Sequence, residues 1–418
     1  MGKDQVPTGN HDDHVSAGPW RATLIVGILG VVAAVVIAAA TGLWVLTAAP
    51  IGFLFGFFLE KSDLCGSSAF SEVIMMKDTR KLEGLWVVIA TSMVMFAIGS
   101  ELGWIRLAPK PFIWANDLVG GAIFGVGIVL AGGCVSGTLF KSGQGNLNSM
   151  AALVGIPIGV SAVAYGPLNG FAKSLKQHVI TSADGKSVTL ASLTGLPYWL
   201  LAVIIAGATL AIALFIRRRH RARLAPHAGD EKESKPIVKR VLTRPWKPWH
   251  SGIAIGVLAL AAYVSSAESG RNYPLGVTHG VLDVLVLATD YPVHSVYKKQ
   301  PAKAVEKDSR GHKQATHKPR KHVVWWLVIL VVCLVLGSHV SARLRGRFSL
   351  KPKPPDEIIV AFFGGILTGA GAAIAGGCVV GNIMSGVALM SVGNMLFFIT
   401  VVLANWATTR LYMVGFGR

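Results

Sequence analysis

Long apolar segments constrain this chain more than any other feature. A helix that crosses a bilayer needs about 20 mostly apolar residues. Six candidate spans are 22–46, 85–103, 196–216, 252–266, 323–340 and 394–413. Of the 418 residues 52% are hydrophobic and only 15% are charged, whereas soluble domains average about 25% charged residues. The sequence therefore predicts an all-α, polytopic membrane protein.

The positive charge of the chain is concentrated in loops. A formal net charge of +19 would point to nucleic acid in a soluble protein. Here the segments 217–250, 298–321 and 343–353 contain 11, 9 and 5 of the 40 basic residues. Basic loops between apolar spans are typical of membrane orientation, so no nucleic-acid partner is expected and the bilayer is the expected surroundings.

The sequence repeats itself. The stretch 120–137 matches the stretch 244 residues later at ten positions, which include every glycine and the cysteine of the first copy. Many transporters consist of two duplicated halves. The expected organisation is a polar N-terminal tail at 1–19, a first membrane repeat at 20–216, a basic linker at 217–250, and a second membrane repeat at 251–418 with a basic insertion at 298–322. The halves are expected to be pseudo-symmetric.

Several apolar segments are too short to span and are broken by glycine. Breaks occur at Cys65, at Gly132-Gly133-Cys134 and at Gly376-Gly377-Cys378. Such pieces predict broken helices and re-entrant loops, which survive at membrane depth only where they are buried in protein or line a cavity. Close helix packing by small residues explains Gly121/Gly125 and Gly365/Gly369. It does not explain adjacent glycines, which weaken a helix.

The breaks predict an anion site with thiols. If a short helix starts near each cysteine, its N-terminus offers free N–H groups and partial positive charge. A thiol donates weakly to sulfur or oxygen, and a thiolate attacks sulfur. The alternative is that Cys65, Cys134 and Cys378 are small buried residues, which is our interpretation of Cys333. With no C-x-x-C spacing, a metal or cofactor site is not expected.

Other candidates surround the breaks. Gly133 and Gly377 would turn backbone amides toward a ligand. Lys61 and Lys141 would attract an anion, or else extend to the membrane interface. Ser136, Asn146 and Asn394 would line the path, or else cap a neighbouring helix. His279 lies in the second half roughly where Cys65 lies in the first, without a clean alignment.

These motifs resemble the YeeE/YedE sulfur-transport family. The resemblance rests on Glu60–Gly66, on Gly132–Leu139 with Gly143-Gln144-Gly145-Asn146, and on Gly376-Gly377-Cys378. It implies a pseudo-symmetric helical bundle in the bacterial inner membrane that takes up thiosulfate. It also implies that Cys65, Cys134 and Cys378 pass the anion along by S–H···S hydrogen bonds, and that a small TusA-type cytosolic sulfurtransferase is the partner.

The expected function is therefore a transporter, not an enzyme, for thiosulfate or a related sulfur anion. Placing 217–250 in the cytoplasm puts the Cys134 loop outside and the Cys65 and Cys378 loops inside, so that Cys134 would meet substrate first. Two alternatives stay open. A membrane-embedded sulfurtransferase or thiol redox protein would form a persulfide or disulfide between the cysteines, and a structural protein would tolerate their loss.

Overall fold

Helices make up most of the computed structural model, which describes residues 20–182, 185, 187–223, 244–289, 294–296, 322–350 and 352–415. The helices are α1 (Trp20–Thr41), η1 (Trp44–Thr47), α2 (Ala48–Ser62), α3 (Gly66–Met75), α4 (Arg80–Glu101), α5 (Trp114–Leu130), α6 (Val135–Gly143), α7 (Leu147–Ala164), α8 (Asn169–Leu175), α9 (Leu190–Thr194), α10 (Tyr198–Arg223), α12 (Pro248–Glu268), α13 (Thr278–Thr289), α14 (Trp325–Leu344), α15 (Pro355–Ile374), η2 (Val379–Val387), α16 (Val392–Thr409) and η3 (Arg410–Val414).

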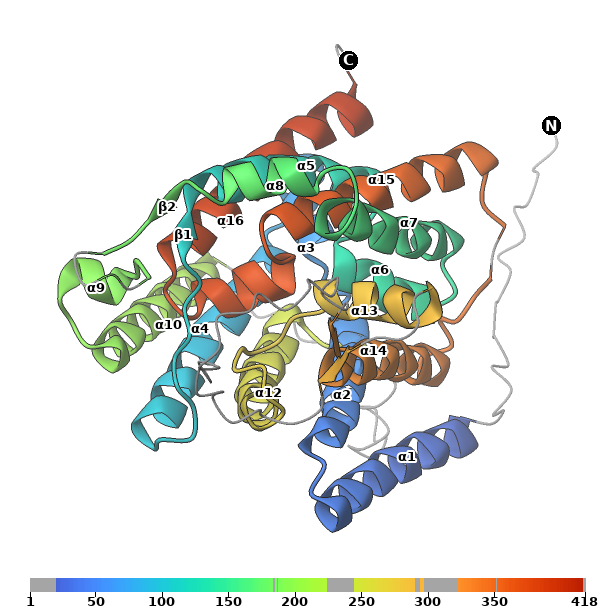
Figure 1. Cartoon of the computed structure of the whole chain (residues 1–418), viewed down its shortest axis with the longest axis horizontal. Coiled ribbons are helices and arrows are strands. Elements are labelled where there is room, and N and C mark those ends of the chain that lie inside the picture. The colour runs from blue at the N-terminus through green and yellow to red at the C-terminus, as the bar shows by residue number, and fades with distance from the viewer. Residues whose placement is uncertain are drawn as a thin grey trace, which may run out of the picture.

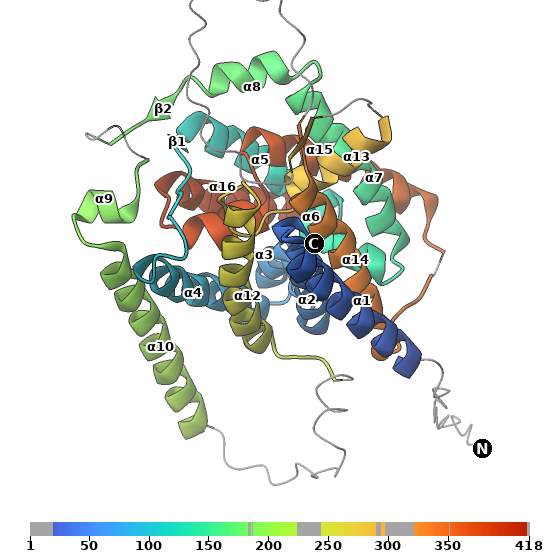
Figure 2. The same cartoon turned by 60° about the horizontal axis from the view of Figure 1, so that its bottom comes forward.

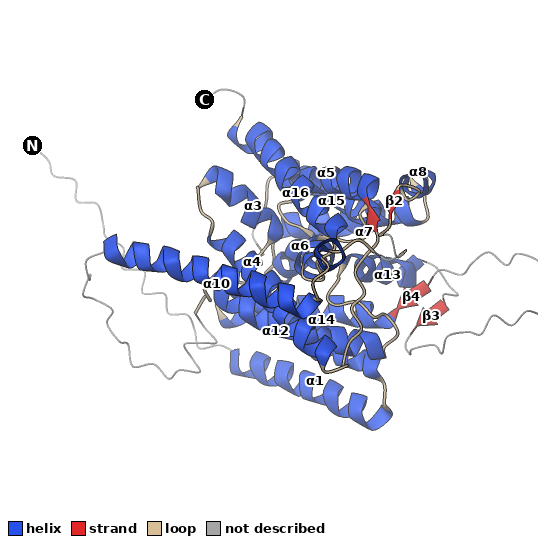
Figure 3. Cartoon of the chain, turned by 90° about the vertical axis from the view of Figure 1, so that its left-hand side faces the viewer, coloured by secondary structure: helices blue, strands red, loops and turns tan. Residues whose placement is uncertain are grey.

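Four short strands complete the fold. They are β1 (Phe112–Ile113), β2 (Val179–Ile180), β3 (His294–Val296) and β4 (His322–Val324). The first two pair antiparallel and the last two pair parallel. Figure 3 shows helices throughout and these strands gathered toward one end.

The described residues contain 8 segments long and apolar enough to cross a membrane. Three of them, Trp44–Met75, Trp114–Gly143 and Pro355–Val387, contain a helix break at the positions where the sequence predicted one. The prediction of an all-α, multi-pass membrane protein with broken helices is confirmed. The tail at 1–19 and nearly all of the insertion at 298–322 lie outside the described residues, and the domain boundaries stay predictions.

The two halves pack as inverted copies of one another. Helix α5 packs on α16 as α15 packs on α7, and α2 packs on α14 as α12 packs on α4. Exchanging the halves therefore maps α2, α3, α4, α5, α6 and α7 onto α12, α13, α14, α15, η2 and α16. In Figure 1 the two halves, coloured from blue to green and from yellow to red, interleave instead of lying apart.

Glycines allow the central helices to approach closely. A Cβ on Gly120 would meet the backbone at Ala375, and one on Gly364 would meet the backbone at Ala131. Helices α5 and α15 are therefore antiparallel neighbours, and their two breaks lie at opposite ends of the pair. Gly121/Gly125 face α16 and Gly365/Gly369 face α7, so these four glycines serve helix packing.

Two ends of the molecule can be told apart. The segment before α12 reaches the end of α2, because the Trp246 N–H donates to the Lys61 carbonyl at 2.9 Å. The loop after α14 reaches the end of α6, where the Ser349 N–H donates to the Gln144 carbonyl at 3.1 Å. Figure 2 shows the C-terminal end of α10 and the start of α12 toward the bottom, and α8 with β2 at the top.

Candidate functional site

Each Gly-Gly break turns the chain at the surface and places its cysteine inside. Gly132 and Gly376 have φ of +65° and +70°, a conformation that favours glycine. Both are exposed, whereas Cys134 and Cys378, two residues later, are fully buried. The backbone turn therefore carries the chain from the surface to a buried thiol within two residues.

All three cysteines precede a short helix, which meets the condition set out for an anion site. Cys65 is the N-cap residue of α3, Cys134 of α6 and Cys378 of η2. None of the three side chains makes a capping hydrogen bond. Each thiol therefore lies beside a helix N-terminus with its partial positive charge.

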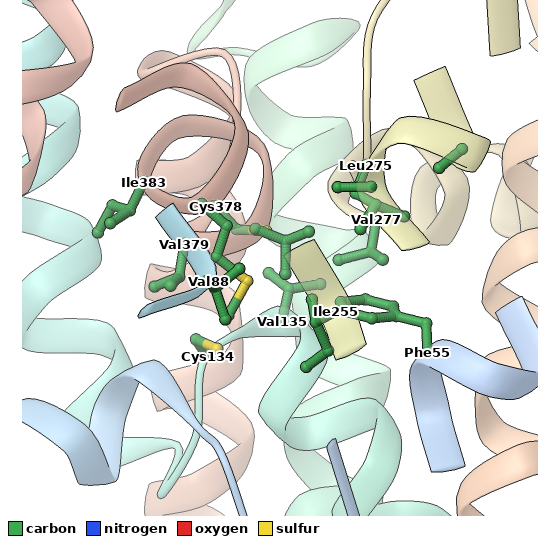
Figure 4. Packing of buried hydrophobic residues seen from close by; sticks show 14 of the residues in the cluster. Phe55, Val88, Cys134, Val135, Ile255, Leu275, Val277, Cys378, Val379 and Ile383 are labelled. Atoms are coloured by element: carbon green, nitrogen blue, oxygen red, sulfur yellow. The ribbon is translucent and has the colours of Figure 1, made fainter. Parts of the chain in front are cut away.

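The thiols form one cluster. The Cys65 and Cys134 sulfurs both lie next to Gly137, and the Ser136 hydroxyl lies 3.4 Å from the Cys134 sulfur. In Figure 4 the sulfurs of Cys134 and Cys378 point toward one another. The structure therefore brings four of the predicted site residues together, namely Cys65, Cys134, Ser136 and Cys378.

Gly137 makes room for this cluster. A Cβ there would overlap the Cys65 sulfur and lie 3.6 Å from the Cys134 sulfur. Only glycine at this position lets the start of α6 approach the Cys65 thiol so closely.

A lysine binds the first glycine of each break. Lys141 Nζ donates to the Gly132 carbonyl at 2.7 Å, and Lys110 Nζ donates to the Gly376 carbonyl at 2.6 Å. The two lysines come from non-equivalent positions, one in α6 and one before α5. Partial burial and the nearby Arg271 charge lower the pKa of Lys110 to about 8.

The second break is also held by an asparagine. The Asn382 amide donates to the carbonyls of Ala375 and Gly377 at 3.0 Å and accepts from Lys110 at 2.6 Å. A Cβ on Gly377 would lie 2.6 Å from Asn382 Oδ1, so this glycine admits the amide. Gly133 packs instead against the backbone around Thr138 in the first turn of α6.

Three predicted residues have other surroundings. Lys61 is fully buried, with its ammonium 5.2 Å from the centre of the Phe57 ring. Asn146 caps α7 by accepting from the Ser149 N–H at 3.3 Å, so the capping alternative is the one observed. Asn394 is buried beside Gly386, and its Nδ2 has no hydrogen-bond partner within the described part of the chain.

A buried ion pair fixes the Cys65 loop. Arg345 Nη1 donates to Glu60 Oε1 at 3.0 Å and to the Glu60 carbonyl at 2.9 Å. Gln144 donates to the same carboxylate at 3.2 Å, and the Ser341 hydroxyl bonds its other oxygen. Both charged side chains are almost completely buried.

These contacts correct the predicted loop arrangement. The Cys65 loop lies at the same end as Gln144, which follows the Cys134 break, and the Cys378 break lies at the other end. Placing the Cys65 and Cys378 loops together was wrong. The error arose because span counting treated each break as a complete re-entrant loop, whereas the antiparallel packing of α5 and α15 decides at which end each break lies.

Sequence reasoning missed Lys110, Arg271 and Asn382. Lys110 lies 266 residues before its partner Gly376, and no local pattern connects them. Asn382 could have been found more easily than Lys110, because it lies four residues after Cys378. A buried amide inside a glycine-framed break needs hydrogen-bond partners. Within the described residues no three His, Cys, Asp or Glu side chains are grouped as metal ligands.

Known proteins resemble this chain over most of its length. The family described as sulphur transport matches residues 61–407. Thiosulfate transporter TsuA of Spirochaeta thermophila is 28% identical over 366 residues, covering 85% of this chain and 95% of the relative. The Escherichia coli protein of the same name is 26% identical, covering 87% and 93%. Probable transporter YedE of Escherichia coli is 33% identical over 117 residues, or 27% of this chain and 28% of the relative.

Proposed function

The chain belongs to the sulphur transport family, and from this premise we propose that it carries thiosulfate, or a closely related sulfur-containing anion, across the bacterial inner membrane. It is a transport protein and not an enzyme, in keeping with the relatives named thiosulfate transporter. Broken helices that meet near the centre of a membrane protein are a common architecture of transporters.

The thiol cluster is the observation that carries the proposal. Cys378 comes from one end of the molecule and Cys134 from the other, and the Cys65 and Cys134 sulfurs both lie next to Gly137. Thiosulfate offers both an oxyanion face and a soft terminal sulfur. A relay of weak S–H···S contacts would hold that sulfur briefly at each thiol, because conduction requires binding that is weak and shared among several sites.

Charge supports a direction for uptake. The described basic segments 244–250 and 343–350 lie at the Cys65 end, and Lys81 pairs with Asp63 of the Cys65 loop at 2.7 Å. Cytoplasmic loops carry an excess of Lys and Arg. We therefore place the Cys65 end in the cytoplasm, so that substrate enters at Cys378, passes Cys134 and leaves past Cys65 and Lys141. This order replaces the expectation that Cys134 meets substrate first.

The test is uptake of labelled thiosulfate in cells that lack other sulfur uptake. Cys134→Ala and Cys378→Ala should each lower uptake strongly, whereas Cys333→Ala in α14 serves as the matched control. The relay idea fails if both variants transport normally. A persulfide on Cys134 found by mass spectrometry would instead favour the sulfurtransferase alternative.

Uptake toward a cytoplasmic Cys65 end favours a TusA-type sulfurtransferase as the partner. Thiosulfate leaving at the Cys65 end would meet a cytosolic acceptor there, and its consumption would draw further substrate inward. Uptake into cells without such a sulfurtransferase, compared with uptake into proteoliposomes, tests whether the partner is required.

A further inference from the structure

The second half of the molecule has no counterpart of Cys65. In the first half, the residue before α3 is Cys65, and its sulfur fills the space beside Gly137. The residue before α13, the equivalent helix, is Val277. His279, which the sequence placed in this role, is exposed. In Figure 4 Val277 lies apart from Cys134 and Cys378.

Space remains where the missing thiol would be. Gly381 is the repeat equivalent of Gly137, and it is buried. Apart from its chain neighbours and the backbone of its own helix, no heavy atom lies within 4 Å of the position that a Cβ on Gly381 would occupy. Interiors are normally close-packed, so a buried glycine that faces open space three residues after Cys378 is unusual.

A tyrosine that bonds Gly381 has two cations against its ring. The Tyr273 hydroxyl donates to the Gly381 carbonyl at 2.7 Å. Lys110 Nζ lies 5.0 Å from the centre of the Tyr273 ring, and the Arg271 guanidinium lies 5.5 Å from it. Lys110 also interacts electrostatically with Cys378. Tyr273 therefore contacts both Gly381, through its hydroxyl, and the two cations, through its ring.

Neither cation is neutralised by a close carboxylate. Lys110 bonds a backbone carbonyl and Asn382, and Arg271 Nη1 bonds the carbonyls of Tyr273 and Pro274. Neither forms a salt bridge with a described residue. Asp117 and Asp283 interact with these cations only at longer range. An arriving anion would therefore find positive charge that is not already paired.

We propose that the space beside Gly381 is the seat in which the sulfur-containing anion rests before it enters the thiol cluster. The terminal sulfur of the anion takes the place of the missing fourth thiol and meets the Cys378 sulfur. Lys110 attracts the oxyanion end, and Tyr273 forms the wall. The seat rests on the proposed function and adds to it the site and the residues that select the substrate.

Gly381→Ala tests the seat directly. The added methyl group meets no atom beyond its chain neighbours and the backbone of its own helix, and Gly381 does not have positive φ, so the variant should fold. In proteoliposomes we expect its KM for thiosulfate to rise at least about tenfold, by analogy with a misplaced contact, while Gly170→Ala leaves KM unchanged. Gly170, in α8, is also a helical glycine with open space around it. An unchanged KM in Gly381→Ala would overturn the proposal.

Two further measurements separate the seat from the transport function. Thiosulfate should slow alkylation of Cys378 in the wild-type protein and in Gly170→Ala, but not in Gly381→Ala. Lys110→Gln should raise KM, Lys110→Arg should restore most of the affinity, and the exposed Lys173→Gln should leave KM unchanged. Protection by thiosulfate without any uptake by the wild type would retain the seat and reject transport. If all these variants take up thiosulfate with the KM of the wild type, the result would retain transport and reject the seat.

Discussion

The substitution Gly137→Ala should displace the Cys65 thiol. A Cβ at position 137 would come closer than 3.0 Å to the Cys65 sulfur, whereas non-bonded heavy atoms prefer about 3.5–4.0 Å. The sulfur must therefore retreat by at least about 0.5–1 Å. Overpacking costs about 1–3 kcal/mol, and replacing a helical glycine by alanine recovers up to about 1 kcal/mol. The net loss of stability should stay within about 2 kcal/mol, so the variant should fold.

Transport should suffer far more than stability. Displacement of a reacting group by about 1 Å can cost about 100-fold in rate, and we expect thiosulfate uptake by Gly137→Ala to fall at least about tenfold. The assay is initial uptake of labelled thiosulfate into proteoliposomes, normalised to reconstituted protein. Gly207→Ala is the control, because Gly207 is a glycine of α10 with no atom near its Cβ position.

A double-mutant cycle isolates the steric cause. If the clash with sulfur is the reason, Gly137→Ala should have little further effect once Cys65→Ala has removed the sulfur, because interacting residues are non-additive. Wild-type uptake by Gly137→Ala, or effects of the two substitutions that simply add, would refute the reasoning.

Three other predictions follow from the same contacts. Arg345→Ala leaves the Glu60 carboxylate buried without its partner and should destabilise the protein by about 3–5 kcal/mol, measured by thermal melting in detergent, while Arg343→Ala should cost much less. Thiosulfate affinity should weaken as the pH rises through about 8, because the lowered pKa of Lys110 leaves it cationic below that pH and neutral above it; Lys110→Arg should abolish this dependence between pH 7 and about 9, since arginine stays protonated, and an equal dependence in both proteins would contradict the assignment. Asn146→Ala removes a helix cap and should lower stability by about 1 kcal/mol with little change in KM, and a large KM effect would place this side chain in the path after all.

Local sequence patterns predicted the candidate site better than the sidedness of its loops. Gly-Gly-Cys demands a turn that only glycine tolerates and places a helix start at the cysteine, so the breaks at Cys134 and Cys378 were correctly located. The roles of Asn146 and Lys61 depended on which neighbours the fold supplies. Asn146 found a backbone N–H to cap, and Lys61 found the Phe57 ring.

The sequence by itself determined that this protein lies in a membrane, that it is duplicated, and that three cysteines mark its broken helices. Those properties follow from local chemistry, since hydrophobic length, a repeated glycine frame and helix-breaking residues act on their own neighbours along the chain. The tertiary structure alone decided which thiols meet, at which end each break opens, and that Lys110 reaches Gly376. Packing brings together residues hundreds of positions apart, and Gly137 and Gly381 show the consequence: equivalent in sequence, one faces a sulfur atom and the other faces open space.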